Sequence, residues 1–146
     1  MKYMLDTNIC VFVLRNKANR AINVINNIKK HKTNDICISA ITYAELIHGV
    51  EKNVNPDKKR LALMLFLSSI SVLDFNQDAA NEYGKIRADL EKQGNVIGTM
   101  DMLIAAHAKS KGLTIVTNNT KEFERVIGLQ IEDWSLEHKE LIPFLF

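Results

Sequence analysis

Acidic residues stand at three points in the chain where an apolar run gives way to a helix-like pattern. Asp6 follows the opening run MKYML, Glu45 lies in ITYAELI, and Asp101 lies in GTMDMLIAAH. A fourth polar stretch, VTNNTKEF, carries Asn119 and Glu122. Carboxylates that gather in one place repel each other unless a cation is present, and the hard ions Mg²⁺ and Mn²⁺ prefer oxygen ligands. Such an ion can activate water and neutralise a phosphate, so the candidate chemistry is metal-assisted phosphodiester cleavage.

Each of these acids also has an ordinary structural explanation. Asp6 is a preferred residue type for capping a helix that follows it. Asp101 falls in the first turn of an expected helix, where an acid stabilises the macrodipole by about 0.3–1 kcal/mol. A lone helix glutamate such as Glu45 is most often simply exposed. The catalytic interpretation therefore depends on the fold bringing these residues together.

The elements that must position them alternate between short apolar runs and helical patterns. Strands are expected at Lys2–Leu5, Asp35–Ser39, Ser71–Phe75, Leu113–Thr117 and Leu129–Trp134. Strands that alternate with helices predict an α/β fold with a mostly parallel sheet and helices on both faces. In such sheets, sites form just beyond the carboxyl ends of the strands. The four polar stretches all fall there.

Helices are expected between these strands. Their predicted ranges are Thr7–Asn16, Ala18–Lys30, Ala40–Glu51, Asp57–Ser69, 77–93, 99–111 and Lys121–Val126. Ser39, Asn76 and Thr99 are predicted to cap helices at their amino ends. Gly94 and Gly112 stand where a glycine commonly ends a helix.

Length and composition exclude several classes of protein. A chain of 146 residues favours one domain, and 47% apolar with 25% charged residues excludes a disordered or low-complexity protein. Cys10 and Cys37 lie in apolar runs and are expected to be buried free thiols in a reducing compartment. The longest uncharged stretch, Leu61–Leu73, is shorter than the roughly 20 residues of a membrane span. We expect a cytoplasmic protein with no membrane partner.

Charge is unevenly distributed along the chain. Residues 1–60 have a net charge of +6, whereas residues 61–146 have a net charge of −4. A basic half favours a polyanionic or acidic partner, although unevenly solvated faces explain the charge equally well. The basic runs 29–32 and 58–60 are more typical of solvated helix ends than of RNA contacts. Arg87 and Lys109 are candidate RNA-binding residues.

The motifs MLDTNI, ITYAELIHGVEK, GTMDMLIAAHAKSKGLTIVTNN and KEFERVIGLQIEDW together resemble PIN-domain ribonucleases, and more narrowly the VapC toxins of toxin–antitoxin pairs. The resemblance runs from residue 1 to about Trp134. It implies a PIN-domain-like three-layer sandwich, with a mostly parallel sheet of about four to five strands flanked by helices. The whole chain, 1–146, would form this single domain, and residues 135–146 form a tail with no assigned role beyond packing.

The resemblance also implies an activity and partners. It implies a Mg²⁺- or Mn²⁺-dependent endoribonuclease toxin that cuts structured RNA, a tRNA or rRNA loop, by means of a metal-activated water. A cognate VapB-like antitoxin would wrap the toxin and block its site, and toxin homodimers would form within the complex. The expected helix Leu61–Leu67 is apolar almost all round, which fits either the core or a face for such a partner.

Site residues carry over position by position. Asp6 and Asp101 match metal-binding aspartates of the family, and Glu45 matches its helix glutamate, which completes the acidic cluster and orients or deprotonates the attacking water. The fourth position departs from the family pattern, because asparagines occupy 118–119 where many relatives have an aspartate. Either an asparagine serves through its carbonyl or Glu122 reaches the site. The number of metal ions, one or two, stays open.

Polar neighbours are expected to hold these carboxylates in place. The candidates for this supporting role are Thr7 and Asn8, which follow Asp6, and Thr117 and Asn119 in the stretch VTNNTKEF.

Other functions remain open on the sequence alone. A nuclease of this kind could process RNA outside a toxin system or act on DNA. A catalytically inactive binding module would use the same acids only as helix caps. A phospho-accepting signalling domain is a weaker alternative, because Asp6 lacks a second acid beside it and residues 117–119, at the end of the fourth strand, contain no lysine.

Overall fold

The computed structural model describes residues 1–137 and contains a five-stranded, wholly parallel sheet. The strand order across the sheet is β3-β2-β1-β4-β5. The strands are β1 (Tyr3–Leu5), β2 (Ile36–Ser39), β3 (Ser71–Leu73), β4 (Thr114–Val116) and β5 (Ile131–Glu132). This sheet confirms the predicted fold class, and each strand lies within its predicted range.

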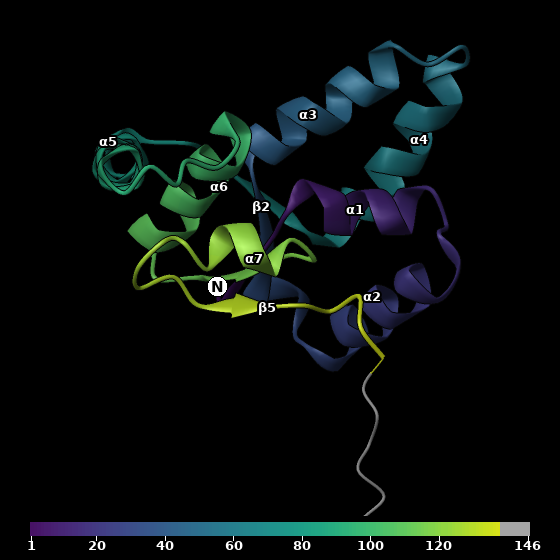
Figure 1. The fold of residues 1–146 in the computed structure, drawn as a ribbon. Coiled ribbons are helices and arrows are strands. Elements are labelled where there is room, and N and C mark those ends of the chain that lie inside the picture. The colour runs from purple at the N-terminus through teal and green to yellow at the C-terminus, as the bar shows by residue number, and fades with distance from the viewer. Residues whose placement is uncertain (138–146) are drawn as a thin grey trace, which may run out of the picture.

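Helices cover both faces of the sheet and make a three-layer structure (Figure 1). The α-helices are α1 (Thr7–Leu14), α2 (Ala18–Lys30), α3 (Ala40–Glu51), α4 (Pro56–Phe66), α5 (Gln77–Lys92), α6 (Thr99–Ser110) and α7 (Thr120–Phe123). Two short 3₁₀ turns lie at Thr33–Asp35 and Leu67–Ser69. In Figure 1, α5 and α6 lie on one side of the sheet, and α1 to α4 lie on the other.

Successive strand residues send their side chains to opposite layers. Met4 pairs in register with Cys37 and Ile115, and all three pack with α5, α6 and α7. The next residues, Leu5 and Val116, pack with α1 to α4 instead. These residues are fully buried on both faces of the sheet. This burial explains why β1, β2 and β4 carry apolar side chains on both faces instead of alternating apolar and polar ones.

The predicted helix caps are mostly confirmed. Ser39 Oγ accepts a hydrogen bond from Ile41 N, and Asn76 caps α5 in the same way. Gly94 and Gly112 end α5 and α6 with φ values of +64° and +65°, in the left-handed region that glycine adopts readily. The prediction for Thr99 is wrong, because Thr99 is already the first helical residue and Gly98 is the cap.

Two further expectations about α4 and the thiols can be compared with the structure. Cys10 and Cys37 are buried free thiols, as predicted. On α4 only Leu63 is buried, at 2% exposed, whereas Leu61 and Leu65 are 58% and 67% exposed. The core therefore explains one part of the apolar helix, and a partner face for the exposed part stays a prediction.

The carboxyl-terminal end of the described chain packs against α2. Trp134 is 3% exposed and stacks on His31, with ring centroids 4.8 Å apart. Asn23 Nδ2 donates a hydrogen bond to Ser135 O at 3.0 Å. The remainder of the expected tail, 138–146, lies outside the described residues. Within residues 1–137, no helix has the length and apolar character needed to cross a membrane.

Candidate active site

The candidate site lies at the carboxyl edge of the three central strands. Both β2 and β4 pair with β1, so the order of the strands reverses at β1. Asp6 directly follows β1, Thr117 directly follows β4, and α3 begins directly after β2. Parallel α/β sheets bind ligands at such a reversal point.

Asp6 is 2% exposed and is held from two sides. Its Oδ1 accepts a hydrogen bond of 2.6 Å from Thr7 N, which caps α1. Its Oδ2 accepts a hydrogen bond of 2.7 Å from Thr117 Oγ1, across from β4. Burial raises the pKa of Asp6 to about 6, with smaller contributions from the charges of Glu45 and Glu122, although the two hydrogen bonds act in the opposite direction. Asp6 is therefore both a helix cap and a member of an acidic cluster.

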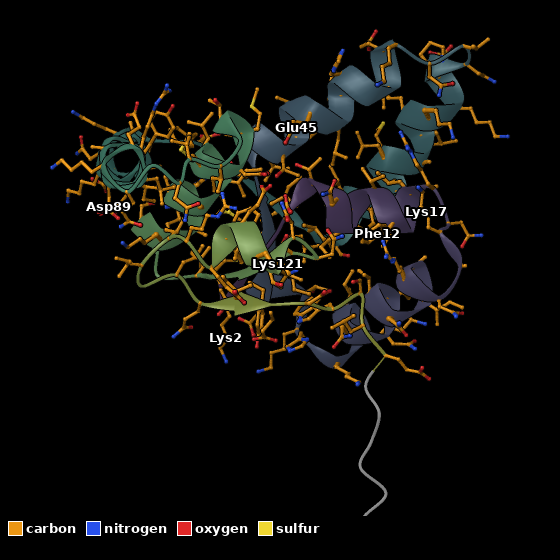
Figure 2. All side chains as sticks on the ribbon, viewed as in Figure 1. Lys2, Phe12, Lys17, Glu45, Asp89 and Lys121 are labelled. Carbon is orange, nitrogen blue, oxygen red and sulfur yellow. The ribbon has the colours of Figure 1, made fainter. Side chains whose placement is uncertain are left out.

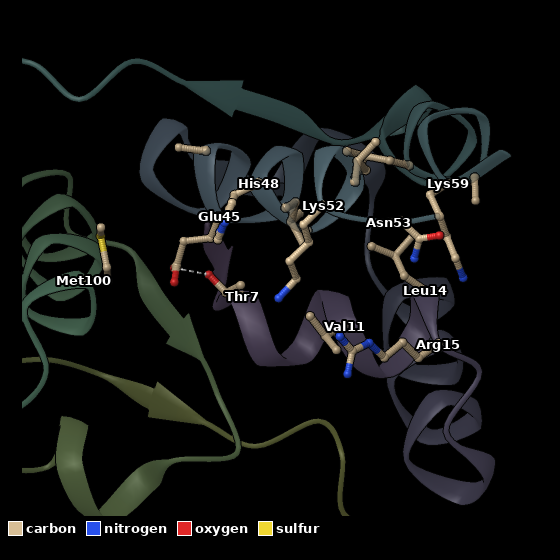
Figure 3. Close-up of a pocket in the computed structure, with 16 residues that line it drawn as sticks. Thr7, Val11, Leu14, Arg15, Glu45, His48, Lys52, Asn53, Lys59 and Met100 are labelled. Atoms are coloured by element: carbon tan, nitrogen blue, oxygen red, sulfur yellow. Dashed lines mark hydrogen bonds between the residues drawn. The ribbon is translucent and has the colours of Figure 1, made fainter. Parts of the chain in front are cut away.

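Thr7 connects α1 to the glutamate on α3. Its hydroxyl donates to Glu45 Oε1 at 2.7 Å (Figure 3). The same Oγ1 lies 3.2 Å from Thr42 Oγ1. Thr42 is fully buried and was not among the predicted site residues. Thr42 precedes Glu45 by three residues on α3, and residues three apart on a helix share a face. This spacing is the sequence signal that could have identified Thr42.

Asp101 and Glu122 complete the cluster from α6 and α7. Burial raises the pKa of Asp101 to about 7, and the negative charges of Asp6 and Glu122 add to the shift, as does a hydrogen bond between Asp101 and Glu122. Glu122 Oε2 in turn accepts a hydrogen bond of 2.8 Å from Asn119 Nδ2. The geometry thus directs Glu122 toward the other acids and gives Asn119 a supporting contact.

Three predicted residues lie apart from the cluster. Asn8 is exposed and has no hydrogen bond to the acids within residues 1–137. Arg87 is engaged with two side chains of its own helix, α5. Lys109 donates to Ile127 O at 2.8 Å, and it lies eight residues along α6 from Asp101, about 12 Å at helical rise. Figure 2 shows Glu45 on α3, and Asp89 on α5 at the outer side of the molecule.

The donor atoms of the cluster fit a hard divalent cation. All are carboxylate, hydroxyl or amide oxygens. After burial, the charges of neighbouring acids also raise the pKa values of Asp6 and Asp101, and a bound cation would offset this repulsion. One further acceptor, Asn118 Oδ1, is buried without a hydrogen-bond partner in the described part of the chain. Residues 1–137 contain no group of three or more His, Cys, Asp or Glu side chains spaced to hold one ion directly. Mg²⁺ retains several waters and binds through one or two carboxylates, so this donor set fits a partly hydrated ion.

A groove of about 560 Å³ opens beside these acids, between α1, α3 and α4 (Figure 3). Thr7, Glu45 and Met100 line the end next to the cluster, and Arg15, Lys52 and other residues line the rest. The acidic edge of the sheet therefore continues into this groove, which is large enough for part of a polymer.

Comparison with known proteins identifies the class to which this fold and site belong. A family model described as PIN domain matches residues 3–129. The chain belongs to the PIN-domain family, as the sequence motifs predicted.

Within the family, the chain is similar to curated VapC proteins. The tRNA(fMet)-specific endonuclease VapC of Shigella flexneri is 48% identical over 135 residues, which cover 92% of this chain and 99% of that protein. Ribonuclease VapC2 of Haemophilus influenzae (strain ATCC 51907 / DSM 11121 / KW20 / Rd) is 42% identical over 134 residues, or 92% of this chain and 98% of that protein.

Solved structures agree with this assignment. The DNA-bound VapBC of Salmonella typhimurium matches with 44% identity and a TM-score of 0.83, over 92% of this chain and 98% of that one. VapBC-1 of nontypeable Haemophilus influenzae matches with 37% identity and a TM-score of 0.84, over 93% of this chain and 100% of that one. The predicted PIN-domain fold and VapC resemblance are confirmed.

Proposed function

We propose that this protein is a Mg²⁺- or Mn²⁺-dependent endoribonuclease toxin that hydrolyses one phosphodiester bond in a structured RNA. The observation that carries the proposal is the convergence of four carboxylates, from Asp6, Glu45, Asp101 and Glu122, at the reversal point of the sheet. Burial raises the pKa of Asp101 to about 7, and the negative charges of Asp6, Glu122 and Glu45 add to this shift. A site that only capped helices would not need acids from four separate elements.

Each residue of the cluster has a distinct role in the proposed reaction. Bound at this site, Mg²⁺ or Mn²⁺ would polarise the scissile phosphate and lower the pKa of an attacking water. Asp6 and Asp101 hold the ion, directly or through water. Glu45 orients the attacking water or accepts its proton, and Thr7 fixes the Glu45 carboxylate by its 2.7 Å hydrogen bond. Thr117 fixes Asp6 in the same way.

The relatives support RNA, and tRNA in particular, as the substrate class. Curated relatives are named ribonuclease, and the one from Shigella flexneri is named a tRNA(fMet)-specific endonuclease. These names favour an active nuclease over an inactive binding module. We therefore infer that a tRNA loop is the first substrate to test, with rRNA and DNA as the alternatives.

The relatives also support a protein partner. The matched structures from Salmonella typhimurium and Haemophilus influenzae are VapBC complexes. We infer a VapB-like antitoxin for this chain, with toxin homodimers in the complex.

The direct test incubates the antitoxin-free protein with purified bulk tRNA, with rRNA and with duplex DNA. Each reaction contains Mg²⁺, Mn²⁺ or EDTA, and mapping of the fragment ends locates the cut. We expect discrete tRNA fragments with either metal and none with EDTA. Absence of cleavage of every RNA by well-folded protein would contradict the proposal, and cleavage of DNA alone would reassign the substrate.

A further inference from the structure

The groove beside Glu45 has a strongly uneven distribution of charge. Arg15, Lys52 and Lys59 line it, whereas Glu45 is the only acidic residue among residues 1–137 that lines it. All three basic side chains are exposed, and none takes part in an ion pair within residues 1–137. Unpaired cations along a channel favour a polyanionic occupant.

Two of these cations lie at the far ends of the helices that carry Thr7 and Glu45. Arg15 follows Thr7 by eight residues at the end of α1, and Lys52 follows Glu45 by seven residues at the end of α3. At the helical rise of about 1.5 Å per residue, the backbones of Arg15 and Lys52 lie roughly 10–12 Å along their helices from Thr7 and Glu45. Figure 3 shows Lys52 extending from α3 toward α1, and Arg15 extending from the end of α1. The groove is therefore acidic at one end and basic at the other.

The wall between these ends is apolar. Val11 and Leu14 from α1, Leu63 from α4 and Met100 from α6 contribute to it. Nucleic-acid bases present apolar faces that pack on such surfaces, whereas their phosphates require cations. An apolar wall together with basic side chains matches a single polynucleotide strand. It matches an acidic peptide less well, because the charges of such a peptide would also be repelled by the carboxylates.

We propose that this groove binds the RNA strand flanking the scissile bond, with Arg15, Lys52 and Lys59 contacting its phosphates. The inference rests on the proposed nuclease function and extends it, because it assigns an RNA-binding subsite to residues outside the acidic cluster.

A charge-neutralising triple variant, Arg15→Gln with Lys52→Gln and Lys59→Gln, tests the subsite. Its matched control neutralises Lys29, Lys30 and Lys32, which precede β2 and therefore lie toward the opposite edge of the sheet. Binding is measured in EDTA, where no cleavage is expected, with a labelled RNA stem-loop that contains the mapped cut, at several salt concentrations. Cleavage of bulk tRNA with Mn²⁺ is measured separately.

We expect the triple variant to lower the slope of log affinity against log salt by about 2–3, since each lost phosphate contact removes about 0.7–0.9. Its KM for RNA should rise at least tenfold while kcat stays within about twofold, because the acids are untouched. The control variant should match the wild type in both measurements.

A second probe locates the contacts on the RNA. Phosphates near the mapped cut are replaced one at a time by neutral methylphosphonates, and binding is compared between wild type and triple variant. At the contacted positions, replacement should weaken binding to the wild type but not weaken binding to the variant further.

The outcomes separate the two proposals. Absence of RNA cleavage by the wild type contradicts the proposed function, whatever the groove variant does. Wild-type cleavage, with a triple variant that matches the control in salt slope and KM, overturns the groove inference alone. If the triple variant binds RNA normally but no longer co-purifies with a co-expressed antitoxin, the groove binds a protein partner. This result also overturns the inference.

Discussion

At the scale of single residues, Asp6 shows why a structural and a catalytic interpretation need not compete. One of its oxygens caps α1, and the other accepts a hydrogen bond from Thr117. Both contacts hold the carboxylate in one orientation, which is what a metal ligand requires. The sequence alone supported both roles, because it shows residue type and position but not contacts between β1 and β4.

The supporting residues were harder to predict than the acids. Thr7 was identified beside Asp6 and Thr117 at the end of the fourth predicted strand, and each hydrogen-bonds to a carboxylate. Thr42 was missed because its contact with Thr7 joins two helices that follow different strands. Asn8 adjoins Thr7 in sequence but faces solvent, so adjacency alone is an insufficient signal.

Thr7 supplies a first prediction at this scale. Thr7→Val removes the hydroxyl that holds Glu45, so we expect kcat for RNA cleavage to fall by roughly 10–100-fold, as is typical when a supporting contact is lost. Thr7→Ser is the matched control, because it keeps the hydroxyl, and it should retain most of the activity. Equal activity of Thr7→Val and Thr7→Ser would show that the contact is dispensable.

Asp101 supplies a prediction about pH. Its pKa is raised in the folded protein from 3.8 to about 7, so the folded state binds more protons than the unfolded state between these values. Stability in EDTA should therefore fall as pH rises from about 4 to about 7. Asp101→Asn removes the group whose deprotonation lowers stability. Because Asp101 is partly exposed, solvent screening reduces the effect, and we expect the free energy of unfolding of the variant to exceed that of the wild type above pH 7 by about 1–2 kcal/mol.

Urea unfolding of both proteins in EDTA at pH 4 and pH 8 measures this effect. The stability difference between variant and wild type should be larger at pH 8. A difference independent of pH would contradict a raised pKa of Asp101 in the folded protein.

At the scale of elements, the carboxyl ends of the strands and the helices after them position the site. Apolar runs were sufficient to predict the five strands, because the central strands β1, β2 and β4 are largely buried and few polar residues interrupt any of the five. Helix ends were less predictable. Thr99 is a favoured capping type, but the backbone of Gly98 adopts the capping position instead. Similarly, α4 begins at Pro56 rather than Asp57, because the fixed φ of proline suits the first helical position.

Ser39 gives a prediction at this scale, because it joins two of the site-bearing helices. Its hydroxyl caps α3, and it lies 2.7 Å from His107 Nδ1 on α6, where both residues are fully buried. Ser39→Ala should lower the free energy of unfolding by about 1–2 kcal/mol. The control Ser68→Ala removes an exposed hydroxyl bonded to Leu65 O and should change stability little. Equal urea midpoints for the two variants would contradict this role for Ser39.

At the scale of the whole molecule, the fold brings together a basic amino-terminal half and acids drawn from both halves. The sequence identified the basic run at 58–60 but not its division between two environments. Arg60 pairs with Glu51 and Asp57, whereas Lys59 lines the groove. That division depends on how α4 packs against α3, which local sequence does not specify.

Metal binding should stabilise the whole fold, because a cation relieves repulsion among the buried acids. At about 100 times its dissociation constant, a ligand of the native state adds roughly 2.7 kcal/mol. For a domain of this size each kcal/mol raises Tm by a few degrees, so Mn²⁺ at pH 8 should raise Tm by about 5–10 °C relative to EDTA. The double variant Asp6→Asn with Asp101→Asn should lose this shift. A shift that survives in the double variant would place the ion elsewhere.

The central claim is that the acidic cluster cleaves RNA with the help of a divalent ion. The most direct measurement compares wild type and Asp6→Asn on purified bulk tRNA, with Mn²⁺ and with EDTA, because asparagine retains the capping oxygen of Asp6 but not its charge. We predict discrete tRNA fragments from the wild type with Mn²⁺ only, and at least a hundredfold slower cleavage by a variant that folds normally. An Asp6→Asn protein that cuts tRNA at the wild-type rate would contradict the account.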